Sequence, residues 1–323
     1  MLWLPGWVLL HVALAAAFTL LARRYALSRR LIDQPGERRS HAVATPRGGG
    51  ISVVLATFVA SLVLAIQWPG HAQMLASFAL GLAMVAGIGW IDDHRPLSPG
   101  LRLAVQAMAG AVLGWGFQAS GESLLTAALA MVAVMVLVNV WNFMDGIDGL
   151  ATSQALLAAA ALGLMLGSGP WAWLAAAAAA ALAGFLPFNV PRARIFLGDV
   201  GSGAIGYVLA ALLIAALLHR PGHWALLLLP IAAFLVDASF TLSMRIMRGE
   251  KWWRPHVQHA YQRWARHMGR HAPVTVAYGL FSLGAGLCML WAIGLQPSGA
   301  LWVCAFWYGL AGCLWTFQQR KMQ

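Results

Sequence analysis

The chain has 323 residues, of which 61% are hydrophobic and only 10% are charged. A soluble domain carries roughly a quarter charged residues, so this composition excludes a soluble globular protein and predicts a chain that crosses a lipid bilayer repeatedly. The net charge of +11 would suit nucleic acid in a soluble protein. In a membrane protein, excess arginine instead reflects the orientation of the chain in the bilayer and its attraction to anionic lipid headgroups. We therefore expect no nucleic-acid partner.

Long runs of Ala, Leu and Val without period-two alternation predict helices and exclude a β-barrel. We therefore expect an all-α, polytopic membrane protein with a single domain over residues 1–323. Since no Lys or Arg precedes the first apolar run, we expect an uncleaved first span with its N-terminus outside. Eleven transmembrane helices are predicted, at residues 3–22, 49–67, 72–91, 101–119, 123–141, 149–167, 171–188, 201–219, 223–245, 273–294 and 299–318.

The basic residues follow this topology. With the N-terminus outside and the C-terminus in the cytoplasm, 20 of the 21 Lys and Arg residues lie on the inner side, and Arg220 is the exception. Eight of the ten acids lie on the inner side or at that interface. We therefore expect the chemistry to face the cytoplasm.

The first motif, Thr45-Pro-Arg47-Gly-Gly-Gly50, opens the second predicted span after a basic loop. Its glycines and its arginine suit a flexible cationic clamp for an anionic substrate or lipid headgroup. The alternative is a turn that carries orientation charges.

Asp92 and Asp93 end the third predicted span. Adjacent helical residues point about 100° apart, so one acid can face a site while the other orients a partner. Two charges at a membrane boundary are costly and usually functional. The alternative is a pair of loop acids bonded to Arg95 or Arg102.

The densest polar stretch follows the fifth predicted span and reads Asn139-Val-Trp-Asn142-Phe-Met-Asp145-Gly-Ile-Asp148-Gly. Asp145 and Asp148 share a face of a helical turn, and carboxylates this close repel each other unless a cation lies near them. Oxygen donors without Cys or His suit a hard cation, Mg²⁺ before Zn²⁺. The alternative is a helix-capping loop with solvated acids.

A glycine-rich segment, Phe196-Leu-Gly198-Asp199-Val-Gly201-Ser-Gly203, precedes the eighth predicted span. Its glycines permit close backbone approach and leave amide N–H groups free at a helix start. We interpret it as a phosphate cradle beside a metal ligand. The alternative is a tight turn between two spans.

Asp237 falls within the ninth predicted span, near its inner end. An acid inside a membrane is a functional candidate by default. Its alternative role is to pair with a neighbour such as Arg245.

The loop after this span holds His256 and His259, with Arg254 and Arg263 close in sequence. A His-x-x-His pair can bind zinc, but the segment offers no further soft ligand. Arginines beside the pair favour an anion, so we interpret the loop as phosphate-binding. A solvated, basic amphipathic loop and a metal site are the alternatives.

Taken in order, these motifs closely resemble the polyprenyl-phosphate N-acetylhexosamine-1-phosphate transferase superfamily, the group that includes MraY, WecA and TagO. The resemblance covers essentially the whole chain, including the number of spans. The Thr-Pro-Arg-Gly-Gly-Gly and His-x-x-His-Ala-Tyr-Gln segments are most similar to the WbpL-type enzymes that start O-antigen synthesis. Val257 and Gln258 separate the two histidines, so the chain departs from the WecA-like His-x-His-His pattern, and an MraY-type, peptide-bearing substrate is disfavoured.

The resemblance implies an enzyme of the bacterial inner membrane with its active site facing the cytoplasm. It transfers a sugar 1-phosphate from a UDP-N-acetylhexosamine to undecaprenyl phosphate and releases UMP. The sugar is GlcNAc or a deoxy sugar such as FucNAc or QuiNAc, and the product starts an O-antigen or another cell-envelope polysaccharide. The implied cofactor is Mg²⁺, with Mn²⁺ as a substitute.

Matching motif by motif assigns each site residue a role. The implied metal ligands are Asn142 and Asp199. The expected catalytic residues are the four acids Asp92, Asp93, Asp145 and Asp148. The expected substrate-binding residues are Asn139, Arg47, Arg254, His256, His259 and Arg263.

Two rival classes fit parts of this pattern. A transporter for an anionic substrate needs polar sites near the bilayer midplane, and here only Asp237 approaches it. A CDP-alcohol phosphotransferase has a similar Asp-Gly motif, but its pattern continues Asp-Gly-x-x-Ala-Arg, whereas this chain reads Asp148-Gly-Leu-Ala-Thr-Ser. The transferase is therefore the favoured interpretation.

Overall fold

The computed structural model describes residues 3–34, 43–251 and 256–321. Within these ranges the chain is almost entirely helical, which confirms the all-α class, and a helix lies at each of the eleven predicted ranges. These helices are α1 (Leu4–Ser28), α2 (Ile51–Gln67), α3 (Ala72–His94), α4 (Pro99–Ala119), α5 (Leu124–Phe143), α6 (Leu150–Leu166), α7 (Pro170–Asn189), α8 (Gly198–His219), α9 (Ala232–Met247), α11 (Ala272–Ala292) and α12 (Pro297–Lys321).

Eight helical segments of the described chain are long and apolar enough to cross a membrane, which confirms a polytopic membrane protein. Two further apolar helices, α2 and α6, have 17 residues each. The total of eleven crossings and their orientation remain predictions. The eight segments are α1, α3, α5, α7, α8, the η3–α9 unit, α11 and α12, where α3 is counted with η1.

The ninth predicted span is not one continuous α-helix. It begins with two 3₁₀ segments, η2 (Pro221–His223) and η3 (Leu226–Ile231), and α9 starts only at Ala232. Pro230 lies inside η3. A proline has no N–H to donate and its ring crowds the preceding turn, which disfavours regular α-helix at this point. A third 3₁₀ segment, η1 (Pro69–His71), precedes α3.

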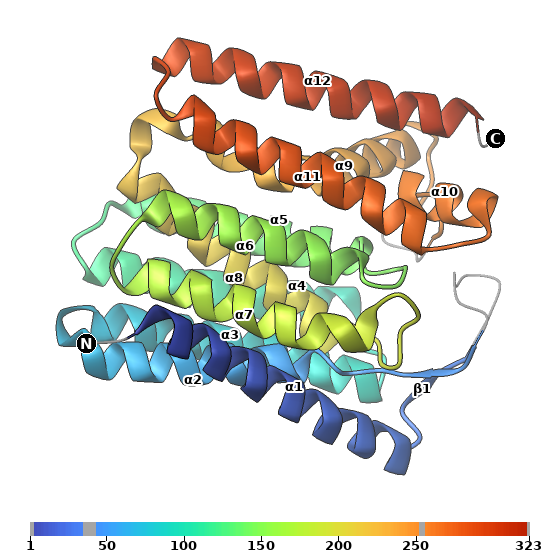
Figure 1. The fold of residues 1–323 in the computed structure, drawn as a ribbon, viewed down its shortest axis with the longest axis horizontal. Coiled ribbons are helices and arrows are strands. Elements are labelled where there is room, and N and C mark those ends of the chain that lie inside the picture. The colour runs from blue at the N-terminus through green and yellow to red at the C-terminus, as the bar shows by residue number, and fades with distance from the viewer. Residues whose placement is uncertain (1–2, 35–42, 252–255, 322–323) are drawn as a thin grey trace.

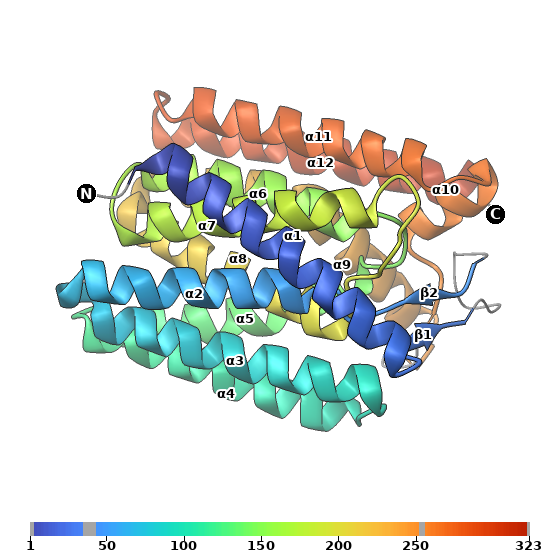
Figure 2. The same cartoon turned by 60° about the horizontal axis from the view of Figure 1, so that its bottom comes forward.

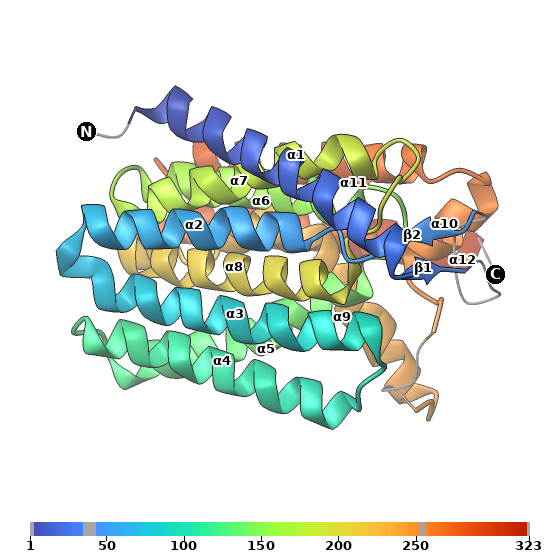
Figure 3. The ribbon, with the colours of Figure 1, turned by 90° about the horizontal axis from the view of Figure 1, so that it is seen from below.

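The helices form one bundle around α8. Figure 3 shows α8 between α2 and α3. In an apolar stretch of 18 residues within α8, 89% of the residues are buried. Figure 2 shows α3 and α4 along one side of the bundle and α11 and α12 along the opposite side. The N- and C-terminal ends of the described chain lie at opposite ends of the bundle, which agrees with an odd number of predicted spans (Figure 1).

One end of the bundle gathers the non-membrane elements. Two short strands, β1 (Ile32–Asp33) and β2 (Thr45–Pro46), pair antiparallel at this end, with Ile32 opposite Pro46. The short helix α10 (Ala260–Met268) lies at the same end (Figure 2). The described residues of the predicted site motifs lie in or beside these loops and helix ends, and Asp237 reaches them through the N-terminus of α10.

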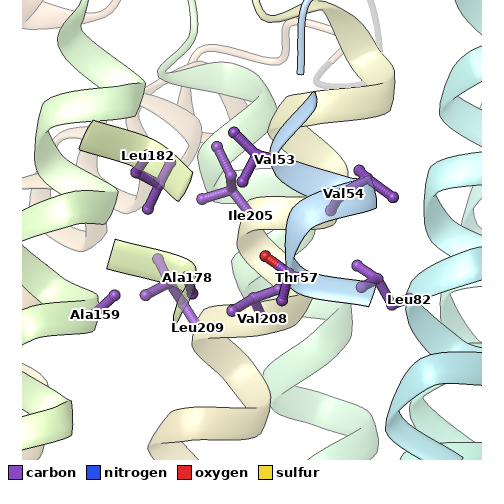
Figure 4. A pocket seen from close by; sticks show the side chains of 11 residues that line it. Val53, Val54, Thr57, Leu82, Ala159, Ala178, Leu182, Ile205, Val208 and Leu209 are labelled. Carbon is purple, nitrogen blue, oxygen red and sulfur yellow. The ribbon is translucent and has the colours of Figure 1, made fainter. Parts of the chain in front are cut away.

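A small apolar cavity marks the packing around α8. Figure 4 shows that Val53 and Thr57 of α2 face Ala178 of α7 and Val208 of α8 across it. Its volume is about 10 Å³, and Thr57 Oγ1 finds no hydrogen-bond partner among the described residues. An ordered water needs two to four polar partners, so we interpret this space as a dry packing defect.

Candidate active site

The two predicted glycine-rich segments lie side by side at the loop end of the bundle. Phe196 N donates to Pro46 O at 2.8 Å, and Gly49 N and Gly50 N donate to Phe196 O and Leu197 O at 2.8 Å. A Cβ on Gly50 would overlap the Cα of Gly201. Only glycine allows this backbone approach, which brings Arg47 beside the start of α8.

Asn142 and Asp199 join two helix ends. Asn142 lies in the last turn of α5, and its Nδ2 donates to Asp199 Oδ1 at 2.5 Å and to Ser202 Oγ at 3.2 Å. Asp199 lies in the first turn of α8. Both side chains are partly exposed. The two predicted metal ligands are therefore in direct contact, although 57 residues separate them in the sequence.

Asp93 caps the N-terminus of α8. Its carboxylate accepts hydrogen bonds from Asp199 N and Val200 N, both at 3.1 Å. Arg47 donates to the Asp93 carbonyl, and its Nε lies 3.8 Å from Asp93 Oδ1. A carboxylate at a helix N-terminus satisfies free N–H groups and complements the helix dipole. Asp93 therefore fastens Arg47 and the start of α8 to the end of α3.

Asp92 points toward α4. Arg102 Nη1 lies 2.8 Å from Asp92 Oδ2, and Leu97 N donates to Asp92 Oδ1 at 2.6 Å. The pairing with Arg102 agrees with the alternative derived from sequence. The two adjacent acids serve different helices, as their angular separation predicts, and both are buried.

Asp145 lies in the turn between α5 and α6, partly exposed and surrounded by other acids. Burial, followed by the negative charges of Asp199, Asp93 and Asp148, raises the pKa of Asp145 to about 8. The structure thus brings four predicted acids within electrostatic reach of one another. Carboxylates this close to one another favour protonation of one of them or the binding of a cation.

Asp148 lies on the far side of the same turn, against α11. His271 Nδ1 lies 3.2 Å from Asp148 Oδ2, and Thr275 Oγ1 donates to the Asp148 carbonyl at 2.8 Å. Gly149 follows with φ of 70°, the left-handed conformation that favours glycine. Asp148 therefore connects the acid-rich turn to α11 while its charge still reaches Asp145.

The donor set fits a hard divalent cation. Asp145, Asp199 and the carboxamide of Asn142 supply oxygen donors on partly exposed side chains. The described residues contain no group of three His, Cys, Asp or Glu side chains already arranged as a metal cage. Mg²⁺ commonly binds through one or two carboxylates and completes its shell with water and substrate phosphates. These residues match that mode.

The predicted histidine loop leads into a short helix, which the sequence interpretation did not specify. His259 is the N-cap of α10, and Gln262 completes a capping box with it. Tyr261 OH donates to the Phe143 carbonyl at 3.0 Å, and the rings of His259 and Phe143 stack 6.2 Å apart. The loop therefore lies against the end of α5, next to Asn142.

The two histidines differ in exposure. His259 is 2% exposed, with Nδ1 at 3.5 Å from Asp237 Oδ1, so its burial favours a role in holding the loop. His256 is partly exposed, and its ring lies 4.8 Å from that of His259. Burial, with the charges of His259 and Arg245, lowers the pKa of His256 to about 4. His256 therefore presents a neutral imidazole near pH 7.

Positive charge on this segment comes from its arginines. Arg263 is partly exposed on α10, and burial and the charges of Arg248 and Arg266 lower its pKa while it remains cationic. Mutual repulsion of this kind suits an anion partner. Arg254, a predicted substrate-binding residue, lies outside the described residues.

Asn139 has hydrogen-bond partners outside the group of acids. It is one turn before Asn142 on α5, and its Nδ2 donates to Gln106 Oε1 of α4 and to the Met135 carbonyl, both at 2.7 Å. The structure thus places this predicted binding residue in a separate contact between α4 and α5.

Sequence interpretation missed several partners in the site. The expected pairing of Asp237 with Arg245 is absent among the described contacts: Arg245 pairs with Glu250 at 2.8 Å, and Asp237 accepts hydrogen bonds from the N-terminus of α10. No sequence motif marks His271, which pairs with Asp148. The one local signal was Gln262 three residues after His259, a spacing typical of a capping box.

Comparison with known proteins identifies a family and several relatives. Residues 75–217, from α3 to α8, match the family described as "Glycosyl transferase family 4". The chain is 34% identical over 211 residues to the decaprenyl-phosphate N-acetylglucosaminephosphotransferase of Mycobacterium tuberculosis, covering 56% of this chain and 52% of the relative. It is 28% identical over 303 residues to the undecaprenyl-phosphate alpha-N-acetylglucosaminyl 1-phosphate transferase of Yersinia pestis, covering 86% and 80%.

A third relative is named for a different substrate from the first two. The chain is 27% identical over 237 residues to the phospho-N-acetylmuramoyl-pentapeptide-transferase of Streptococcus pneumoniae, covering 67% of this chain and 72% of the relative. The chain thus spans about half the length of the Mycobacterium tuberculosis relative and most of the length of the other two.

Proposed function

Because the chain belongs to glycosyl transferase family 4, within the polyprenyl-phosphate N-acetylhexosamine-1-phosphate transferase superfamily, we propose that it is a sugar-1-phosphate transferase. The donor is a UDP-N-acetylhexosamine, the acceptor is undecaprenyl phosphate, and UMP is released. Two relatives support this assignment, since their names combine a polyprenyl phosphate with an N-acetylglucosamine phosphate.

One observation carries the proposal: helix ends that are far apart in the sequence bring Asn142, Asp145 and Asp199 together. The helix α10, which carries Arg263, contacts the end of α5 through Tyr261. The reaction joins two phosphorylated molecules, so its barrier includes bringing anions together. A site with oxygen donors for a cation and guanidinium groups nearby lowers that repulsion.

We assign the metal site to Asp199 and Asn142, with Asp145 beside them. When bound, Mg²⁺ supplies Lewis-acid stabilisation of the donor diphosphate and of the leaving UMP. Asp93 keeps Asp199 in place through the backbone of α8, since it accepts hydrogen bonds from Asp199 N and Val200 N. Arg47, bonded to Asp93, places its positive charge at the same helix start.

The lipid phosphate needs no strong base. A phosphate monoester has its second pKa at about 6, so the acceptor is largely a dianion at pH 7. Asp92 and Asp93 already accept hydrogen bonds from Leu97, Asp199 and Val200. We therefore assign this pair a positioning role, and we favour direct attack of a lipid phosphate oxygen on the sugar-bearing phosphorus over a covalent aspartyl intermediate.

The proposed enzyme class also suggests which donor sugar is used and which polymer is started. We propose GlcNAc or a deoxy relative such as FucNAc or QuiNAc, used to start an O-antigen or a related envelope polysaccharide at the cytoplasmic face of the inner membrane. The Streptococcus relative acts on a muramoyl-pentapeptide by its name. The His-x-x-His loop of this chain supports a donor without a peptide.

The test uses the purified full chain in detergent with undecaprenyl phosphate, Mg²⁺ and a panel of UDP-N-acetyl sugars. We expect UMP and a lipid-linked sugar only when acceptor, donor and divalent cation are all present. Absence of UMP with every donor would overturn the proposal, and flux of an anion through proteoliposomes without UMP formation would favour the transporter class.

A further inference from the structure

Asp237 is a buried acid of α9 whose carboxylate is surrounded by donors. Its side chain is 2% exposed. Two of its donors are backbone groups at the first positions of α10, and two are hydroxyls from α9 and α11. They are Ala260 N at 2.9 Å, Tyr261 N at 3.1 Å, Thr241 Oγ1 at 3.2 Å and Tyr278 OH at 2.8 Å. A single carboxylate thus holds the N-terminus of α10.

Packing alone leaves α10 incompletely supported. A cavity of about 140 Å³ lies between α9, α10, α11 and α12. Its walls include Trp264 of α10, Asp237 of α9, Tyr278 and Phe281 of α11, and Trp315 of α12. Because Trp264 borders this open space, the position of α10 depends more on the polar contacts at its N-terminus.

The held end of α10 touches the acid-rich turn. Tyr261, which donates its N–H to Asp237, also donates its hydroxyl to the Phe143 carbonyl at 3.0 Å. A Cβ on Gly146 would overlap that hydroxyl, so α10 and the turn that carries Asp145 are in close contact. A shift of α10 therefore moves its arginine relative to the predicted metal ligands.

We propose that Asp237 is a positioning residue for the transfer reaction, holding α10 so that His256 and Arg263 face the donor diphosphate beside the acid-rich turn. The inference rests on the proposed function. Asp237 lies outside residues 75–217, which match the family model, and the contacts described above carry the assignment.

The main variant is Asp237→Asn, which keeps the shape of the side chain but replaces one acceptor oxygen with a donor. We expect the KM for the UDP-sugar to rise about tenfold, since a hydrogen bond to a charged group is lost. The KM for undecaprenyl phosphate stays at the wild-type value. A purely structural role would instead reduce the active fraction, which lowers kcat and leaves KM unchanged.

Two further variants distinguish the contacts that Asp237 makes with α10 from its contact with α11. Tyr278→Phe is the matched control, because it removes a donor to the same carboxylate from α11, and it should keep the wild-type KM. Ala260→Pro removes only one N–H of α10. Proline suits the first helical position, and His259, with φ of −59° and ψ of 146°, has the extended backbone that precedes proline. It should raise the KM for the UDP-sugar as Asp237→Asn does.

A second measurement does not depend on turnover. Trypsin should cut after Arg263 and Arg266 faster in Asp237→Asn and Ala260→Pro than in wild type or Tyr278→Phe. Wild-type KM and wild-type cleavage in Asp237→Asn would overturn the inference, as would an equal rise of KM in Tyr278→Phe. If the wild-type protein turns over no UDP-sugar, the proposed function fails, and cleavage alone decides whether Asp237 holds α10.

Discussion

Asn142 Nδ2 donates to Asp199 Oδ1 at 2.5 Å and thereby ties the last turn of α5 to the first turn of α8. Asp93 of α3 accepts hydrogen bonds from the backbone of the same turn of α8. Three helices therefore end at one point, and the acid-rich turn after α5 lies beside it. The proposed chemistry depends on this meeting of helix ends.

Removing either predicted metal ligand should abolish turnover. We expect Asp199→Ala and Asn142→Ala to lower kcat by about 100-fold or more, since each removes an oxygen donor from the site where charge develops. UMP release measures the effect, and thermal unfolding in detergent checks the fold. His219→Ala, an exposed position at the other end of α8, should behave as wild type. Wild-type turnover by Asp199→Ala would remove the metal assignment.

Cation binding should depend on pH through Asp145. Its pKa of about 8 means that the carboxyl is mostly protonated at pH 7 in the absence of a cation. A divalent ion favours the carboxylate, so binding releases a proton and the Mg²⁺ affinity rises as pH increases from about 6 to 8. Calorimetric titrations at several pH values measure this slope. Asp145→Asn should make the slope shallower, and a slope that this substitution leaves unchanged would contradict the assignment.

The aspartate pair should not behave as a general base. Asp92→Asn should lower kcat by about tenfold, because it weakens the ion pair with Arg102. The pH dependence of kcat should keep its wild-type shape, since the second ionisation of the lipid phosphate governs it. Loss of the acidic limb of the pH profile in Asp92→Asn would instead identify this residue as the base.

Arg263 should contribute to donor binding. Arg263→Ala should raise the KM for the UDP-sugar by about tenfold, as expected when one charged hydrogen bond to a phosphate is lost. Arg320→Ala is the matched control, because it removes an exposed arginine from the end of α12 with the same change in net charge. Equal effects of the two substitutions would indicate a general electrostatic effect instead of a specific contact.

Disturbing the close approach of the two glycine-rich segments should lower the stability of the protein. Gly50→Ala places a Cβ against Gly201 and should destabilise the protein by about 1–3 kcal/mol, the range for overpacking a tight contact. Gly279→Ala on α11 has open space around the added Cβ and should be neutral or slightly stabilising. Thermal unfolding of both variants decides the point.

Much of the helical architecture could be predicted because long apolar runs have few alternatives in a bilayer. The exception, the start of α9, has a local cause in Pro230, which the hydropathy pattern does not register. The short helix α10 could not be derived in the same way. It has only nine residues, and its N-terminus is held by Asp237, more than 20 residues earlier in the chain.

The site residues themselves followed from motifs, but their partners did not. Sequence spacing brought Asp145 and Asp148 together, whereas the structure turns Asp148 toward His271 of the loop before α11. The contact of Asp93 with the backbone of α8 depends on how two spans pack, and no local pattern encodes it. The roles assigned to these residues remain predictions until the variants are measured.

The central claim is that Asp199 and Asn142 hold one divalent ion where the two phosphorylated substrates meet. Electron paramagnetic resonance of Mn²⁺, titrated into the purified protein with the UDP-sugar present, tests it most directly. The account predicts one tightly bound ion per wild-type chain and none in Asp199→Ala. Equal Mn²⁺ binding by both proteins would contradict it.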